Sequence, residues 1–565
     1  MTVSDQPAAP NAAPSGPSNG EDAGLLRSSL VMAIGTVVSR ITGFVRSLFL
    51  VWALGSALFA DTFSLANALP TSIYILVAGG ALNAVFVPQL VRAMKQDNDG
   101  GEAFGNRLLT LTTLVLAGAT VVTVAAAPLL VRVFASDELL TPANREYFDL
   151  AVTFARYCLP QVFFMGLFVI IGQILNSRGK FGPMMWAPIV NNLVSIAVFV
   201  AFIVVSDART PDEITSRETM LLGLGSTLGI ALQSLVLLPV LRKAGFRLRA
   251  RFDFRGGGIG KATRLAGWTV ALVLVNQIWF ATATRLTTGA AAQAKELFGS
   301  DLGYGLTPYL QAFLIMQLPH AVITVSLVAA LLPRISRLAA DGATDRVRSD
   351  ISHALRVICV AILPAVAAFL ALGPHLTLGL YRISGDMSKT AAMFIGFVLM
   401  GFAPALLGFC SHYTLLRGFY AYEDTRTPLF INIVVVGVGV GCAIAAYFVL
   451  PVQWKTVGVA VAYGIGYWTG FAVSSAILRR RLGGLEGGRI LGTYVRAGIA
   501  ALLGGGAAYG VATAITAWLG EDPLPALLAT FAGGLVLLGV YLVVARLLRV
   551  PELTEILGLV RRRAT

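Results

Sequence analysis

Long apolar runs, separated by short polar segments, follow one another along almost the whole chain. A run of about 20 residues is the length that an α-helix needs to cross the hydrocarbon core of a membrane. Glycine and proline are tolerated inside such helices. The pattern therefore predicts an all-α polytopic membrane protein with about fourteen transmembrane helices. The predicted spans are 29–55, 64–93, 106–134, 147–175, 182–205, 219–241, 264–289, 305–332, 354–380, 390–416, 427–450, 456–478, 493–518 and 525–548.

The composition agrees with a membrane protein and argues against a nucleic-acid partner. The 565 residues are 56% hydrophobic and only 13% charged, whereas soluble domains carry about 25% charged residues. A net charge of +14 would suit nucleic-acid binding, but the basic residues cluster in short loops between apolar runs. That distribution is typical of membrane topology, so no nucleic-acid partner is expected.

The loops also predict orientation. The segment 242–264 is the most basic stretch, the even-numbered loops share its character, and the chain ends in three arginines at 561–563. The odd-numbered loops near 136, 206 and 520 are acidic or mixed. Because basic loops stay in the cytoplasm, both termini are expected to be cytoplasmic.

Internal similarity divides the chain into two six-helix lobes. "PIVNNLV" at 188 aligns with "PLFINIV" at 428, which places Asn192 opposite Asn432, and further similar pairs follow in the same order. Such repeats are frequent in transporters. Six spans are an even number, so both lobes enter from the same side and a cavity is expected between them. The expected parts are a disordered tail 1–24, a first lobe 25–241, a basic cytoplasmic linker 242–263, a second lobe 264–482, spans 13 and 14 at 488–550 and a basic tail 551–565.

Charge inside the first span is the most unusual chemical feature. Arg40 and Arg46 interrupt the apolar run, and an arginine at the centre of a membrane helix costs about 2.5–3.5 kcal/mol on insertion scales. One interpretation is an anion site, because a guanidinium fits phosphate in a bidentate way and stays charged. The other is an internal ion pair, with Asp61 as the partner of Arg46. Gly43 between the two arginines is expected to let the helix bend.

Other candidates carry two interpretations each. Arg285 near the end of span 7 either faces the cavity or reaches to the membrane interface. Gln317, Pro319 and His320 interrupt span 8, which suits a proline-kinked, moving helix, and His320 is either a hydrogen-bonded core residue or a proton carrier. In "RGFYAYEDTRTP" at 417–428 the charged residues form either an ion-pair gate or a static loop. Its charged residues are Arg417, Glu423, Asp424 and Arg426.

Several function classes find no support. The sequence has no nucleotide-binding loop, nucleophile elbow or carboxylate pair, so no enzymatic activity is expected. The four cysteines and four histidines are scattered, without ligand spacing, so no metal site is expected. The segment 1–23 lacks the pattern of a signal peptide.

"SRITGFVR", "ADTFSLANALP", "LPHAVITVSLVAALLPRIS" and "RGFYAYEDTRTP" together resemble the MurJ/MviN lipid II flippases, especially the actinobacterial branch. The resemblance covers roughly residues 25 to 550. It implies the fold of the multidrug/oligosaccharidyl-lipid/polysaccharide exporter superfamily, with two lobes in a V and two further helices that form a groove for a polyprenyl tail. The groove would be spans 13 and 14.

The resemblance implies that lipid II, an undecaprenyl-pyrophosphate glycolipid, moves from the inner to the outer leaflet of the bacterial cytoplasmic membrane by alternating access. Ser39, Arg40 and Arg46 fall on the family's motif in span 1, and Asp61 matches an acidic residue just beyond that span. Arg285 and Gln317 are the expected contacts of the second lobe. Gating is expected at Gly43, Pro319, Arg417, Glu423, Asp424 and Arg426.

This chain departs from better-known relatives at three places. Tyr74 and Ile75 replace an arginine pair, Gly79 replaces a glutamate, and Leu314 and Gln317 replace an arginine and a glutamate. The full cationic ring is therefore absent, so Arg40 and Arg46 are expected to carry most of the positive charge.

No cofactor is expected, and coupling to an ion or to the membrane potential has no site that the sequence locates. The expected partners are lipid II, membrane lipids and cell-wall synthesis proteins. Two rival functions stay open: an exporter of drugs or other polyprenyl-linked glycans, and a scaffold for cell-wall assembly that transports nothing.

Overall fold

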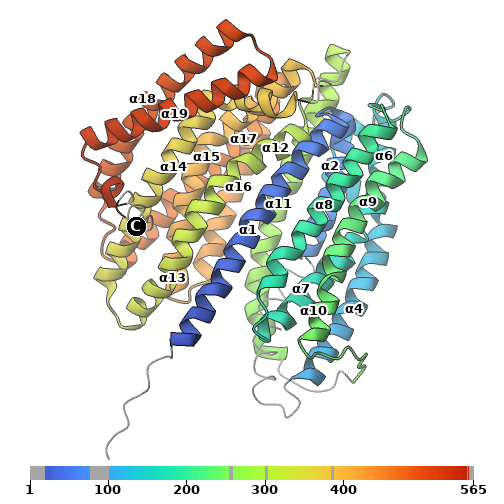
Figure 1. The fold of residues 1–565 in the computed structure, drawn as a ribbon, viewed down its shortest axis with the longest axis horizontal. Coiled ribbons are helices and arrows are strands. Elements are labelled where there is room, and N and C mark those ends of the chain that lie inside the picture. Colours follow the sequence, from blue (N-terminus) through green and yellow to red (C-terminus); the bar gives the residue numbers. More distant parts are fainter. Residues whose placement is uncertain are drawn as a thin grey trace, which may run out of the picture.

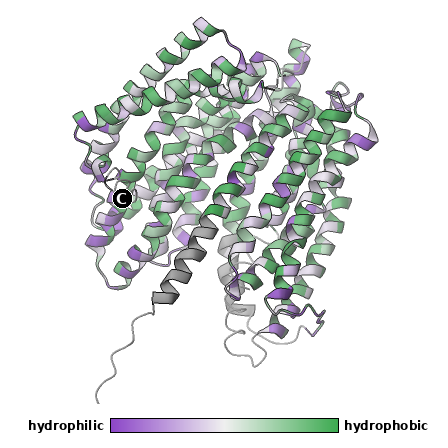
Figure 2. Cartoon of the chain, in the orientation of Figure 1, coloured by the Kyte–Doolittle hydropathy of each residue, from purple (hydrophilic) through white to green (hydrophobic). Residues whose placement is uncertain are grey.

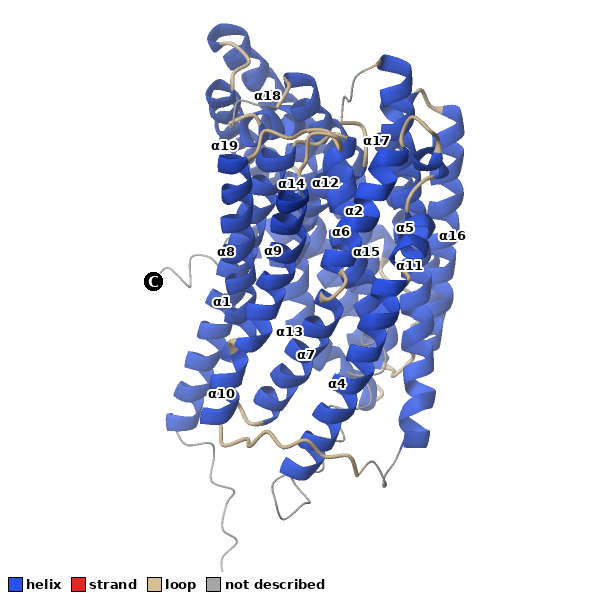
Figure 3. Ribbon diagram, turned by 90° about the vertical axis from the view of Figure 1, so that its right-hand side faces the viewer, coloured by secondary structure: helices blue, strands red, loops and turns tan. Residues whose placement is uncertain are grey.

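Helices form the regular structure of the protein. The computed structural model describes residues 19–76, 101–253, 259–299, 303–383, 387–555 and 558, with backbone only for 19–33, 259–266, 268 and 269. No strand occurs in these ranges (Figure 3). Thirteen helical stretches in the described part are long and apolar enough to cross a membrane. Hydrophobic residues cover the long helices (Figure 2). The predicted all-α polytopic membrane fold is confirmed.

The first half of the chain forms spans that are often broken at a proline. The third predicted span is two helices that meet just before Pro128, and the fourth is two helices that meet at Pro160. Proline lacks a backbone N–H, so these breaks have a local cause. The helices are α1 (Asn19–Leu54), α2 (Leu58–Tyr74), α4 (Glu102–Ala125), α5 (Ala127–Phe134), α6 (Arg145–Cys158), α7 (Gln161–Ser177), α8 (Gly182–Val205), α9 (Ser216–Leu235) and α10 (Leu237–Lys243), with the 3₁₀ turn η3 (Asp137–Leu140).

The second half contains longer helices and one π-helical segment. The eighth span is α12, a π-helical turn η4 that begins directly after Pro319, and α13. The elements are α11 (Ile259–Phe298), α12 (Leu306–Pro319), η4 (His320–Thr324), α13 (Val325–Ala340), α14 (Thr344–Tyr381), α15 (Lys389–Ala421), α16 (Arg426–Val449), α17 (Val452–Arg481), α18 (Gly487–Leu519) and α19 (Pro523–Leu547).

Two predicted segments, the second span and the N-terminal tail, reach beyond the described residues. The second span, 64–93, begins within α2, but residues 77–100 lie outside the described part of the chain. The predicted disordered tail is 1–24, of which 1–18 lie outside the described residues; α1 begins at Asn19, so residues 19–24 of that segment are helical. Extending an existing helix fixes one residue per hydrogen bond, which makes such an extension cheap.

The helices pack in two groups that meet at one end (Figure 1). Helix α1 packs against α8, and α8 against α9, while α14, α15, α16 and α17 pack with one another. Helices α18 and α19 pair with each other and lie against α14, at the upper left of Figure 1.

The hydrophobic cores show where the groups meet. We call the end with loops 55–57, 135–144 and 303–305 the joined end, and the end with loops 178–181, 244–253, 341–343 and 482–486 the basic-loop end. At the joined end the core clusters mix the two halves: Leu48 and Val51 pack with the second half, and Leu306 packs with the first. At the basic-loop end each half has a core of its own.

Candidate functional site

Helix α1 carries its two arginines without protein counter-ions. Arg40 is exposed and Arg46 half-buried, and among the described residues neither has a hydrogen-bond or ion-pair partner. Six residues along an α-helix turn by about 600°, so the two side chains leave α1 about 120° apart. The helix runs without interruption through Gly43.

An asparagine fixes α1 to α8 beside this site. The Asn192 amide donates to the carbonyl of Ser39 (3.1 Å) and to the Thr42 hydroxyl (3.0 Å). Its repeat counterpart, Asn432 on α16, donates to Asn276 on α11 (3.3 Å). Each asparagine therefore joins the fifth span of its half to the first, so the sequence repeat has a structural counterpart.

Asp61 lies at the joined end and binds the other half of the molecule. Its carboxylate accepts hydrogen bonds from the backbone N–H groups of Leu306 (2.8 Å) and Thr307 (2.6 Å), and it is only 1% exposed. These groups form the N-terminus of α12, where a negative charge is favourable. Ser64 on the same face of α2 contacts the Thr307 hydroxyl at 3.0 Å. Asp61 thus ties α2 to α12, and Arg46 has no ion pair with it.

Arg285 belongs to the same set of contacts. Its guanidinium donates to the carbonyl of Arg132 (2.9 Å) and pairs with Asp137 at 2.7 Å. It therefore ties α11 to the first half at the joined end. Three further side-chain contacts cross there: Asn144 to Glu296 (3.0 Å), Gln293 to Glu138 (2.9 Å), and the Ser136 N–H to Thr288 (3.1 Å).

The eighth span has its irregularity at the predicted place. A π-helical turn follows Pro319, and such turns are frequent at functional sites. Gln317 is half-buried and has no partner among the described residues. His320 is buried and lies against α15, with its ring centroid 4.3 Å from that of Phe409 and 5.0 Å from that of Tyr413.

The charged residues of 417–428 make different contacts. Asp424 accepts hydrogen bonds from the N–H and hydroxyl of Thr427 at the start of α16, and it pairs with Arg481 of α17 at 2.6 Å. Arg417 lies one turn inside α15, over the ring of Tyr413 at 4.1 Å. Glu423 and Arg426 are exposed. Partial burial disfavours the Asp424 carboxylate, but the Thr427 and Arg481 hydrogen bonds outweigh it and hold its pKa below the usual range.

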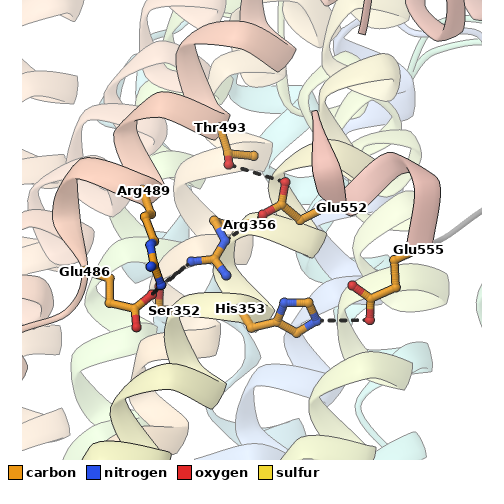
Figure 4. A network of polar contacts seen from close by, with 8 residues as sticks. All are labelled: Ser352, His353, Arg356, Glu486, Arg489, Thr493, Glu552 and Glu555. Atoms are coloured by element: carbon orange, nitrogen blue, oxygen red, sulfur yellow. Dashed lines mark hydrogen bonds and ion pairs between the residues drawn. The ribbon is translucent and has the colours of Figure 1, made fainter. Parts of the chain in front are cut away.

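A buried ion network that the sequence interpretation missed joins α14 to α18 and to the segment after α19 (Figure 4). Arg356 donates to Glu486 (3.2 Å), Glu552 (2.6 Å) and Ser352 (2.8 Å). Thr493 donates to the second Glu552 oxygen at 3.4 Å. The available signal was Arg356 itself, an arginine two residues inside the predicted span 354–380.

The network also lowers the pKa of a loop carboxyl. Burial disfavours the charged form of Glu486, but hydrogen bonds from Arg356 and Ser352 outweigh it, so its pKa falls below the usual 4.5. Among the described residues, no group of three or more His, Cys, Asp or Glu side chains is placed to hold a metal ion.

Comparison with known proteins places the chain in a family. The family model described as "Lipid II flippase MurJ" matches residues 50–528. A probable lipid II flippase from Rhizobium tropici is 29% identical, with 81% of both chains covered. The lipid II flippase of Burkholderia cenocepacia is 27% identical, over 78% of this chain and 81% of its own.

Solved structures share the fold. A lipid II flippase MurJ in an inward closed conformation has a TM-score of 0.69 and 17% identity, with 92% of this chain and 98% of that chain covered. An inward-facing multidrug resistance transporter of the MATE family has a TM-score of 0.62 and 16% identity, with 81% of this chain and 99% of that chain covered. The resemblance seen in the sequence is confirmed: this chain is a member of the lipid II flippase MurJ family.

Proposed function

We propose that this protein moves lipid II from the inner to the outer leaflet of the bacterial cytoplasmic membrane and catalyses no covalent chemistry. The family match over residues 50–528 is the observation that carries the proposal. Arg40 and Arg46 precede the matched range, and their proposed role rests on their unpaired charge within a membrane helix. A pyrophosphate supplies the bidentate acceptors that such guanidinium groups lack here.

Alternating access follows from the difference between the two ends. With the halves joined at the Asp61 end and their cores separate at the basic-loop end, the substrate headgroup would enter from the basic-loop end. Release on the other side requires the Asp61 and Arg285 contacts to break. The basic loops support a cytoplasmic position for the entry end and for both termini.

Helices α18 and α19 are proposed to hold the polyprenyl tail. Their outer faces expose large apolar side chains, which suit a lipid surrounding. Among them are Leu502, Leu503, Trp518, Phe531 and Leu535. The membrane potential would help to reset an empty, cationic site, because it draws positive charge inward.

The test is depletion of the protein in its native bacterium, with rescue by wild type or by Arg40→Ala. Depletion should leave lipid II headgroups inaccessible to an outside probe, and Arg40→Ala should fail to restore access. Arg337→Ala removes an exposed cation of α13 and serves as a matched control that rescues. Full rescue by Arg40→Ala contradicts the binding site, whereas unchanged access on depletion contradicts the function.

A further inference from the structure

A pocket of about 530 Å³ lies beside the ion network of Figure 4, near the basic-loop end. Helices α14 and α18 and the segment after α19 line it, so it belongs to the second half alone and is separate from any cavity between the halves. Its size is within the range of sites that hold small ligands. The charged residues that line it are His353, Arg356, Arg489, Arg496, Glu552 and Glu555.

The ion network neutralises the charge on the buried side of this pocket. Arg356 is held by Glu552 at 2.6 Å and by Glu486 at 3.2 Å. The side chains of Arg356 and Glu552 are only 13% and 7% exposed. Since these charges satisfy one another inside the protein, they are not available to a ligand.

Charges of both signs remain accessible in the exposed part of the pocket. Arg496 is exposed and has no hydrogen-bond or ion-pair partner among the described residues. Arg489 is 75% exposed and reaches the Glu486 carboxylate at 3.4 Å, which is long for a hydrogen bond. Glu555 is also exposed and contacts Nε2 of His353 at 3.3 Å (Figure 4). A ligand that matches this pocket therefore carries an anionic group for the arginines and a cationic group for Glu555.

One face of α18 supplies both polar and apolar contacts. Arg489 and Arg496 are seven residues apart, about two turns, so they lie on the same face. Gly488 and Gly492 line the pocket between them, and a Cβ on either glycine would meet no atom within 4 Å. A ligand can therefore approach the backbone closely here. Ile499, three residues beyond Arg496, is exposed and apolar, so the face passes from cationic to apolar as a lipid does.

An arginine that only reaches to the membrane interface would explain the exposure of Arg496, but it gives no role to Glu555 or to the open glycines. Basic pockets between membrane helices on the cytoplasmic side bind phosphate headgroups of lipids. We propose that this pocket binds an inner-leaflet phospholipid whose headgroup carries both a phosphate and a primary ammonium, as phosphatidylethanolamine does. The phosphate binds Arg489 and Arg496, the ammonium binds Glu555, and an acyl chain lies along Ile499.

Such a lipid ties α18 to the segment after α19, and through His353 to α14. It is a component of the surrounding membrane rather than the transported molecule, so the inference does not depend on the proposed function. Its headgroup chemistry is also present in soluble O-phosphoethanolamine, and the test separates these two sources.

The test is native mass spectrometry of the purified protein in detergent, titrated with phospholipids that share the same acyl chains. Wild type should bind phosphatidylethanolamine more tightly than phosphatidylglycerol, which lacks the ammonium, and than phosphatidylcholine, whose ammonium has no N–H to donate. Arg496→Gln should lower the affinity for phosphatidylethanolamine about tenfold, because a charged hydrogen bond is lost. Arg496→Lys keeps the charge without the planar fork and should give a smaller loss.

Glu555→Gln separates this site from a general attraction to phosphate. It should lower the affinity for phosphatidylethanolamine about threefold, the effect of one exposed charge pair, without lowering that for phosphatidylglycerol. Arg546→Gln, which removes an exposed cation of α19 outside the pocket, is the matched control and should bind as wild type does. Thermal unfolding of each variant shows that the fold is intact.

Three results would overturn the proposal. Wild-type affinity for phosphatidylethanolamine in Arg496→Gln would remove the phosphate contact. Equal losses for phosphatidylethanolamine and phosphatidylglycerol in Glu555→Gln would remove the ammonium contact and leave an unselective basic surface. Displacement of the lipid by O-phosphoethanolamine at the same concentration would assign the pocket to a soluble phosphate compound instead of a membrane lipid.

Discussion

Arg356 and Arg46 are the same residue type on membrane helices, and their surroundings differ completely. The Arg356 side chain is 13% exposed and held by Glu486 and Glu552 (Figure 4). Arg46 is half-buried, with no partner among the described residues. A paired arginine stabilises the fold, since removing it leaves buried carboxylates behind. An unpaired one costs insertion energy without stabilising the fold, which points to a role with the substrate.

The largest expected effect comes from breaking the paired site. Arg356→Met should lower the free energy of unfolding by about 3–5 kcal/mol, because two carboxylates lose their counter-ion. Thermal unfolding of detergent-purified protein measures this. Arg46→Gln is the matched control and should unfold like wild type. Equal stability of Arg356→Met and wild type would remove the contrast between the two arginines.

The second-largest effect is expected from a substitution at the joined end. Asp61→Asn keeps the shape but removes the charge that holds two amides of α12, at a cost of about 1–3 kcal/mol. Hydrogen exchange at Leu306 and Thr307 should accelerate accordingly. The Ala391 amide, which is capped by Ser388 (3.2 Å), should exchange as before. Unchanged exchange at α12 would show that Asp61 does not hold this end.

The paired charge at the basic-loop end predicts a pH dependence. The pKa of Asp424 is lowered in the folded state, so its stabilisation is present above the unfolded value of 3.8 and is lost as pH falls through the folded value. Arg481→Gln should cost about 1 kcal/mol at neutral pH. That difference from wild type should shrink below the usual pKa of Asp424. A constant difference across the acid range would argue against the ion pair.

The smallest effect concerns Gly43. A Cβ there would lie 3.5 Å from the Asn192 amide, an ordinary contact, so Gly43→Ala should stabilise α1 by about 0.5–1 kcal/mol. If Gly43 bends during transport, the same change slows lipid II translocation while the unfolding midpoint rises. A faster or unchanged rate would leave Gly43 without a gating role.

Span positions could be predicted from the sequence because the length of an apolar run is a local property. The proline breaks at Pro128 and Pro160 also have local signals. The contact partners of individual side chains could not be predicted from the sequence in the same way. Asp61 was weighed as the partner of Arg46, its neighbour in sequence, yet it binds α12 about 245 residues away, and a single sequence does not pair distant helices.

The 417–428 segment shows the same limit on a shorter scale. Arg417 and Asp424 are seven residues apart, which suggested one ion-pair cluster. The end of α15 lies between them, so one residue stacks inside the helix while the other caps α16. Arg417 and Asp424 are therefore close in sequence but make contacts with different helices, because α15 ends between them.

The most direct test of the unpaired arginine is translocation by Arg46→Gln in reconstituted vesicles, with thermal unfolding measured on the same preparation. The initial rate of lipid II translocation should fall about tenfold or more, while the unfolding midpoint stays at the wild-type value. A wild-type rate, or a lost rate accompanied by unfolding, would contradict the assignment of Arg46 to the substrate.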